Sequence, residues 1–131
     1  MIVSKLAQDK NIFDKVDELF FKELDIKIHS NKLDIVYVIM ENNNLLGACL
    51  ISLDSKIAYL DSIFIKKEFR KMRIGDGLLR ASLNYVIRKG INKIYCSEKS
   101  DFLNREGFFN TNEENICDID EFFNTSSCGD K

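Results

Sequence analysis

Three apolar runs separated by two short polar turns limit the folds open to this chain more than any other feature. The runs are Ile35–Met40, Leu45–Leu53 and Ile57–Ile65, and the turns are Glu41–Asn44 and Asp54–Lys56. β-Branched residues, which favour strands, recur in the runs, and the Asn, Asp and Ser residues between them suit tight turns. Strands joined by such short turns pair antiparallel, so the sequence predicts a three-stranded meander.

The residues before the meander are typical of a strand followed by a helix. Ile2–Leu6 is a short strand-like run, and from residue 12 to residue 24 apolar side chains recur at three- and four-residue spacing, which is helical. Asp9 or Asn11 is suited to cap the first helical turn. His29–Asp34 is polar and irregular, so we expect a loop there.

After the meander the pattern returns to a helix and a further strand. Helical periodicity extends over Ile74–Arg88, and Gly90 is suited to end that helix. Ile91–Ser97 then predicts a strand that lies parallel to the last meander strand after a right-handed crossover. Asp101–Glu106 allows one or two helical turns, and Phe108–Ile119 one or two weak strands. The order predicts an α/β fold with a mixed, mainly antiparallel sheet, a central parallel strand pair and helices on both faces.

Length and composition favour one soluble domain. We expect it over residues 1–123 of the 131-residue chain, followed by a frayed polar tail at 124–131. Hydrophobic residues make up 45% of the chain and charged residues 31%, so we do not expect the whole chain to be disordered. No apolar run reaches the roughly 20 residues of a membrane span, and Lys5, Gln8, Asp9 and Lys10 stand where a signal peptide would have an apolar stretch, so we expect a cytoplasmic protein.

The cysteines favour buried thiols over a metal site. Cys49, Cys96, Cys117 and Cys128 form no C-x-x-C pair, and His29 is the only imidazole in the sequence. We therefore expect no metal. Cys49 and Cys96 lie in apolar strand-like runs, where a reduced thiol behaves as a small hydrophobic side chain.

Positive charge is concentrated directly after the third meander strand. The formal net charge of −2 gives no general reason to expect nucleic acid or a membrane as a partner, and we expect neither. Between Lys66 and Arg73, however, five basic residues accompany one acid, Glu68. Such a run is ordinarily a solvated surface, and it gains functional meaning only beside a phosphate site.

The start of the second predicted helix could be such a site. Gly75 and Gly77 lie in its first turn, where unpaired N–H groups point outward and a ligand can approach the backbone closely. A diphosphate suits this arrangement, and the alternative is a surface turn whose glycines serve packing. A nucleotide P-loop is excluded because Leu78 and Leu79 follow in place of a Lys-Ser or Lys-Thr pair, and a dinucleotide fold because the helix follows an antiparallel meander.

Two landmarks in this region resemble the GNAT acetyltransferase family. Tyr59–Leu79 resembles the acetyl-CoA motif of that family, in which an apolar strand leads through an R/Q-x-x-G-x-G/A turn into a helix. Phe102–Phe108 resembles the F-Y-x-x-x-G-F pattern that follows it, and the whole resemblance covers roughly residues 1–109. It implies direct transfer of an acetyl group from acetyl-CoA, as co-substrate, to a primary amine of a small molecule or protein in a ternary complex.

The resemblance also implies a set of cofactor-binding residues. Ile63, Phe64 and Ile65 would pair with the pantetheine arm, and Asn104 and Arg105 would reach the adenosine end. The diphosphate would be held by Arg70, Lys71, Met72, Arg73, Ile74, Gly75, Asp76 and Gly77. The alternatives are solvated arginines at 70 and 73 and plain surface positions at 104 and 105.

The catalytic residues are expected on the strand beside the thioester. Asp61 interrupts a mostly apolar run and is the first candidate for the base that deprotonates the ammonium, and its alternative is a solvent-side strand position. Tyr59 lies two residues away on the same face and could position water. Ser97 is a candidate acid on the following strand, and Tyr95 and Ser100 are conceivable.

Two departures from the family pattern leave other functions open. Arg73 stands where the motif has its first glycine, and Leu103 replaces the tyrosine that protonates the departing CoA thiolate in many relatives. A simple thiol has a pKa near 8.5, so the thiolate leaves without much help. The alternative function is a GNAT-fold module that binds acyl-CoA with little or no catalysis. A nucleic-acid-binding domain is disfavoured by the acidic remainder of the chain.

Little of the chain is left to form an acceptor pocket. It is short for the family, so we expect a small acceptor site, or one completed by a second subunit of a homodimer. Cys96 has no histidine near it in sequence, so a covalent acyl intermediate is not expected.

Overall fold

The computed structural model describes residues 1–128, apart from the side chains at 71, 72 and 125–128, and contains a six-stranded sheet of order β1-β2-β3-β4-β5-β6. All neighbouring strands are antiparallel except β4 and β5, which are parallel. The strands are β1 (Ile2–Leu6), β2 (Ile35–Glu41), β3 (Asn44–Asp54), β4 (Ile57–Ile65), β5 (Lys93–Tyr95) and β6 (Ile116–Asp118). The predicted mixed sheet with one parallel pair is therefore confirmed.

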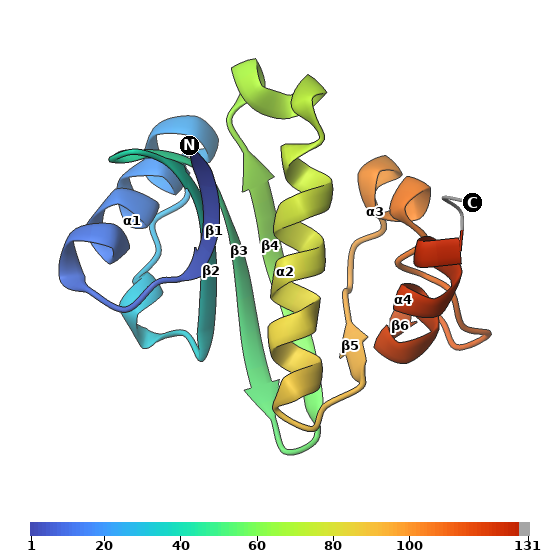
Figure 1. Cartoon of the computed structure of the whole chain (residues 1–131). Helices are drawn as coiled ribbons and strands as arrows, with labels where there is room; N and C mark the ends of the chain where they lie inside the picture. Colours follow the sequence, from blue (N-terminus) through green and yellow to red (C-terminus); the bar gives the residue numbers. More distant parts are fainter. Residues whose placement is uncertain (129–131) are drawn as a thin grey trace.

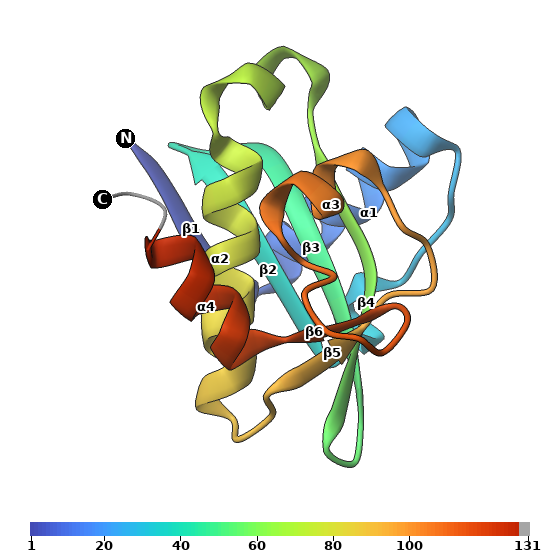
Figure 2. The same ribbon diagram turned by 90° about the vertical axis from the view of Figure 1, so that its right-hand side faces the viewer.

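Helices cover both faces of this sheet (Figures 1 and 2). The α-helices are α1 (Lys10–Leu24), α2 (Ile74–Arg88), α3 (Asp101–Glu106) and α4 (Ile119–Cys128), and short 3₁₀ helices cover Ser30–Lys32 and Lys67–Met72. α1 lies on one face, and α2 lies on the other with α3 and α4 beside it. Within the described residues, no helix is both long and apolar enough to span a membrane.

Two hydrophobic cores result, because side chains alternate between the faces of each strand. On one face α1 buries Ile12, Val16, Leu19 and Phe20 against β2 and β3. On the other face the buried side of α2 consists of Leu78, Leu79, Leu83 and Val86, packed among residues of β2 to β5. Asp9 caps α1, since its side chain accepts a hydrogen bond from the Ile12 N–H at 3.0 Å.

The parallel pairing between β4 and β5 is short. It joins Ala58 to Ile94 and Tyr59 to Tyr95, where β5 ends, whereas β4 continues to Ile65. The strand predicted at Ile91–Ser97 is therefore longer than the observed one. Beyond Tyr95 the chain turns toward β6 and α3 instead of following β4, and the edge of β4 from residue 60 to residue 65 is left without a strand beside it.

A β-bulge lies in the same part of β4. Leu50 of β3 is opposite Ser62 and Ile51 is opposite Leu60, so Asp61 is an extra residue without a partner on β3. Such bulges bend a strand and change where its side chains point.

α4 is an element that the sequence analysis does not predict. It begins where Asp118 accepts a hydrogen bond from the Glu121 N–H at 3.1 Å, and it continues to Cys128, so the tail expected from residue 124 is helical at its start. Ile119 and Phe122 are fully buried, and this packing stabilises a segment of poor helix formers. Residues 129–131, the rest of the expected tail, lie outside the described residues.

Gly47 allows β3 and β4 to approach closely. A Cβ atom at Gly47 would lie 2.6 Å from the Phe64 carbonyl oxygen and 3.1 Å from Ile65 Cα, so the backbone would have to shift. We predict that Gly47→Ala lowers the free energy of unfolding by about 1–3 kcal/mol in urea denaturation. Gly77→Ala is the matched control, because its Cβ would have no neighbour within 4 Å and alanine favours helix. An unchanged unfolding midpoint for Gly47→Ala would contradict the close packing described here.

Arg73 occupies a backbone conformation that favours glycine. It joins the 3₁₀ segment to α2 with φ 60° and ψ 18°, in the left-handed region that costs a non-glycine residue about 1–2 kcal/mol. We predict that Arg73→Gly is more stable than Arg73→Ala by about 1 kcal/mol in urea denaturation, since both variants lose the same side-chain charge. Equal stability of the two variants would show that the left-handed conformation carries no cost here.

Candidate functional site

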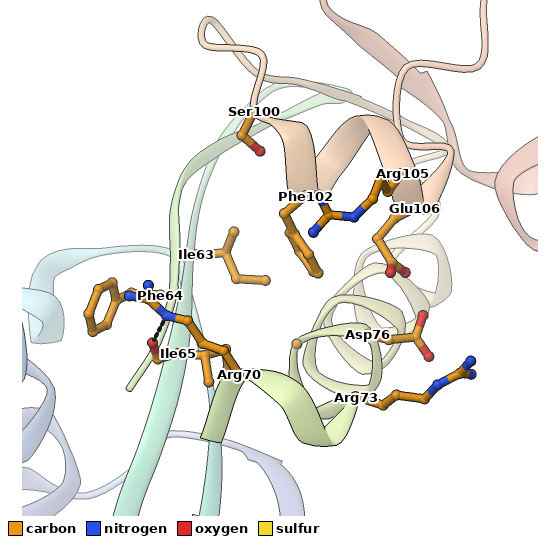
Figure 3. A pocket seen from close by; sticks show the side chains of 11 residues that line it. Ile63, Phe64, Ile65, Arg70, Arg73, Asp76, Ser100, Phe102, Arg105 and Glu106 are labelled. Atoms are coloured by element: carbon orange, nitrogen blue, oxygen red, sulfur yellow. Dashed lines mark hydrogen bonds between the residues drawn. The ribbon is translucent and has the colours of Figure 1, made fainter. Parts of the chain in front are cut away.

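A pocket of about 650 Å³ lies beside the unpaired end of β4 (Figure 3). Its walls come from the end of β4, the turn into α2, the first turn of α2, and α3 with the residue before it. The lining residues are Ile63, Phe64, Ile65, Arg70, Arg73, Gly75, Asp76, Ser100, Phe102, Arg105 and Glu106. The divergence of β5 from β4 therefore opens a cavity that α2 and α3 border.

Most of the residues predicted to bind a cofactor line this pocket. They are Ile63, Phe64, Ile65, Arg70, Arg73, Gly75, Asp76 and Arg105. Ile74 is buried in the core instead, Gly77 and Asn104 are exposed outside the pocket, and the side chains of Lys71 and Met72 lie outside the described residues.

Three further residues line the pocket without having been predicted as cofactor contacts: Ser100, Phe102 and Glu106. Phe102 belongs to the second sequence landmark, which could have marked it as a pocket residue. No pattern in the sequence marks Glu106, because it reaches the pocket only through the packing of α3 near α2.

Phe102 explains why residue 75 is glycine. A Cβ atom at Gly75 would lie 3.1 Å from two ring atoms of Phe102 and 3.6 Å from the Ile65 side chain. The absence of a side chain thus lets α3 pack against the start of α2. Packing is therefore one reason for the glycine, and access of a ligand to the backbone at this position stays a prediction.

The N-terminal end of α2 is open to an anion. The N-cap residue Arg73 makes no side-chain hydrogen bond to the first turn, and the Gly77 N–H donates to the Arg73 carbonyl at 3.2 Å. The helix dipole and the unpaired N–H groups of the first turn therefore combine at one wall of the pocket.

Arg70 is held in place and is not a freely solvated arginine. Its Nε donates a hydrogen bond to the Ile65 carbonyl at 2.8 Å, and its guanidinium lies 5.0 Å from the centre of the Phe64 ring. One N–H group of Arg70 thereby closes the turn after β4, and the remaining N–H groups keep positive charge at the pocket wall.

Two carboxyl groups face one another at the pocket, Asp76 from α2 and Glu106 from α3 (Figure 3). Burial raises the pKa of Glu106 to about 7, and the hydrogen bond and negative charge of Asp76 add to the effect. Partial burial alone would raise the pKa of Asp76, but hydrogen bonds from Glu106 and Arg80 outweigh it and lower that pKa. Arg80 Nε lies 3.1 Å from Asp76 Oδ1. Asp76 is therefore the ionised partner and Glu106 the one that holds a proton near neutral pH.

The predicted catalytic residues do not line this pocket. Ala58 and Leu60 face the α2 side of the sheet, so Tyr59 and Asp61, which alternate with them, face the α1 side. The Tyr59 ring packs edge-on against Tyr95 with 5.7 Å between the ring centres.

Asp61 is exposed on this second face and accepts a hydrogen bond from the Ser52 hydroxyl. Tyr59 and Asp61 thus lie on the same face of β4, and their catalytic roles stay a prediction. Ser97 is exposed just beyond the end of β5, and its role as an acid stays a prediction.

Cys49, Cys96 and Cys117 are free, buried thiols. Burial raises the pKa of Cys49 and of Cys117 to about 12, and burial also raises the pKa of Cys96, whose Sγ donates to the Glu98 carbonyl at 3.2 Å. In the part of the chain that the structure describes, no group of three His, Cys, Asp or Glu side chains is arranged to hold a metal ion.

Known structures share this architecture. A GNAT family acetyltransferase from Brucella melitensis in complex with acetyl-CoA matches with a TM-score of 0.65 and 15% identity, over 82% of this chain and 82% of that chain. The ribosomal-protein-S18-alanine N-acetyltransferase from Escherichia coli matches with a TM-score of 0.68 and 9% identity, over 84% of this chain and 75% of that chain. An aminoglycoside acetyltransferase from an uncultured soil metagenomic sample, in complex with sisomicin, matches with a TM-score of 0.65 and 14% identity, over 83% of this chain and 84% of that chain.

Sequence comparison identifies the family directly. Curated protein sequences gave no match. The sequence profile of the Acetyltransferase (GNAT) family, in contrast, matches residues 3–110. That match includes the unpaired end of β4, the start of α2 and all of α3. The chain belongs to the GNAT family of acetyltransferases.

Proposed function

We propose that this protein is an N-acetyltransferase that transfers the acetyl group of acetyl-CoA to a primary amine of a small molecule or protein. The observation that carries the proposal is the pocket between the unpaired edge of β4 and the uncapped start of α2. The acetyl-CoA present in the related Brucella structure supports the co-substrate, and the amine substrates named for the E. coli and metagenomic proteins support the acceptor class.

The residues of the pocket fit the parts of coenzyme A. The pantetheine arm carries amides, which can pair with the backbone of β4 beyond Tyr59 as an added strand would. A diphosphate suits the first turn of α2, where N–H groups without helix partners meet positive charge from Arg73. Ile63, Ile65 and Phe102 supply apolar surface between these polar ends.

The acceptor amine is proposed to approach from the face that bears Asp61. Asp61 accepts a proton from the ammonium, directly or through a water held by Tyr59, and the neutral nitrogen then attacks the thioester carbonyl. The C–N bond forms and the C–S bond breaks, while unpaired N–H groups on β4 can stabilise the oxyanion. The nitrogen loses its second proton as the amide forms, and the departing thiolate gains one from Ser97, the proposed donor, which regains its proton from that nitrogen through water. Ser100, which lines the pocket, is an additional donor.

A GNAT-fold module that binds acyl-CoA without turnover is the second candidate. It is favoured by Leu103, whose side chain is 3% exposed and packs in the core, so that this position supplies no acid. Release of coenzyme A that depends on an added amine would exclude this candidate. A cytoplasmic location and a homodimer remain predictions.

The cofactor assignment is tested by calorimetric titration with acetyl-CoA. We predict that Gly75→Glu abolishes binding, because the added carboxylate occupies the proposed diphosphate site with both bulk and charge. Gly75→Ala is the matched control, since it places the same Cβ 3.1 Å from the Phe102 ring without the charge, and it should bind within about tenfold of the wild type. A wild-type protein that binds no acetyl-CoA would overturn the proposed function.

The base assignment is tested by steady-state kinetics with any amine that supports turnover. We predict that Asp61→Asn lowers kcat by about 100-fold or more, the usual effect of losing a general base, and leaves acetyl-CoA affinity unchanged. Ser52→Ala removes only the hydrogen bond to Asp61 and should lower kcat much less. If Asp61→Asn retains wild-type kcat, the base is another group.

A further inference from the structure

The pair formed by Asp76 and Glu106 is not explained by the binding of a polyanion. Both carboxyl groups line the pocket, one from the first turn of α2 and the other from the last turn of α3, and Figure 3 shows them pointing toward one another. A site that takes a diphosphate would be weakened by two negative charges at its wall. Their presence therefore requires a compensating charge or a proton.

The positive charges near the pair do not cancel it completely. Arg80 forms an ion pair with Asp76 at 3.1 Å and also lies 5.6 Å from the centre of the Phe122 ring of α4. The charge of Arg73, before α2, acts to lower the pKa of Asp76, and the charges of Arg80 and of Arg105, on α3, act to lower the pKa of Glu106 without reversing its rise. β4 contributes only apolar side chains to the pocket. Neither Arg73 nor Arg105 lies between the two carboxyl groups in Figure 3.

We propose that the Asp76–Glu106 pair couples cofactor binding to proton uptake, so that acetyl-CoA binds with one proton shared by the two carboxyl groups. This inference rests on the proposed function. It makes the affinity of the pocket sensitive to pH across the neutral range, through residues outside the predicted set of catalytic groups.

The direction of the effect follows from the state of Glu106. Its pKa in the free protein is raised to about 7 by burial and by Asp76, so near neutral pH the pair carries a proton in only part of the molecules. A bound diphosphate adds negative charge beside the pair and raises that pKa further, which draws in a proton. Acetyl-CoA affinity should therefore increase as the pH falls, and it should weaken by up to about tenfold per pH unit between the pKa of the free pair and the higher pKa of the bound pair.

The experiment is calorimetric titration with acetyl-CoA at pH 7.5 in two buffers that differ in ionisation enthalpy, which gives the number of protons taken up. We expect the wild type to take up more protons than Glu106→Gln. The protonation of acetyl-CoA itself is the same in both titrations, so the difference belongs to the protein. The variant should also lose affinity less steeply than the wild type between pH 6.5 and pH 8.5. Asp76→Asn, which frees Glu106 from its neighbour, should likewise reduce the uptake.

Asp101→Asn is the matched control. Asp101 is an exposed acid in the first turn of α3 that does not line the pocket, so this change removes a charge from the same helix and should leave proton uptake at the wild-type value. Equal proton uptake in the wild type and in both Glu106→Gln and Asp76→Asn would overturn the inference while leaving the proposed cofactor intact. Absence of acetyl-CoA binding at every pH would instead overturn the proposed function.

A measurement without the cofactor tests the pair independently. The unfolded chain has Glu106 near its ordinary pKa of about 4.3, so the folded protein binds the extra proton and loses stability as the pH rises from about 5 to 7. The melting temperature of Glu106→Gln should therefore rise relative to that of the wild type over this range and remain higher above it. A constant difference between the two proteins would contradict the shared proton.

Discussion

The site depends on the point at which β5 stops following β4. Two parallel strands that stayed paired along their whole length would satisfy each other's backbone groups and leave no space between them. Here the pairing ends at Tyr59 and Tyr95, and β4 continues to Ile65 without a neighbour on that side. Free backbone N–H and C=O groups at the centre of a domain are costly unless something pairs with them, so this edge is suited to a ligand that carries amides.

The elements around this opening keep it from closing. The first turn of α2, which has no side-chain cap, lies beside the opening, and α3 packs against that turn because Gly75 leaves room for the Phe102 ring. Arg70 holds the intervening loop by its hydrogen bond to the Ile65 carbonyl. The packing of Phe102 against Gly75 joins the two landmarks in the sequence, so the landmarks are parts of one packed unit.

Local sequence patterns made most of the fold predictable. The meander strands follow from apolar runs bounded by turn residues, α1 and α2 follow from apolar spacing of three and four residues, and Asp9 is the N-cap of α1, as the sequence suggested. α4 could not be predicted, since its stability comes from the burial of Phe122 and not from helix propensity. The residues that line the pocket were predictable where they are close together in the sequence, at Ile63–Ile65, Arg70, Arg73, Gly75 and Asp76. Glu106 was not, because only the packing of α3 on α2 brings it to Asp76.

The burial of the thiols affects how the chemistry of this protein can be observed. Cys49, Cys96 and Cys117 are almost completely shielded from solvent, and their pKa values are raised. A thiol reagent reacts with the thiolate form and needs access to the sulfur, so these three side chains should react slowly in the folded state. Coenzyme A released into solution carries an unhindered thiol. In an assay with such a reagent, the colour would therefore come mainly from released coenzyme A, because these three cysteines react slowly. A faster reaction of the protein's own thiols would indicate unfolding.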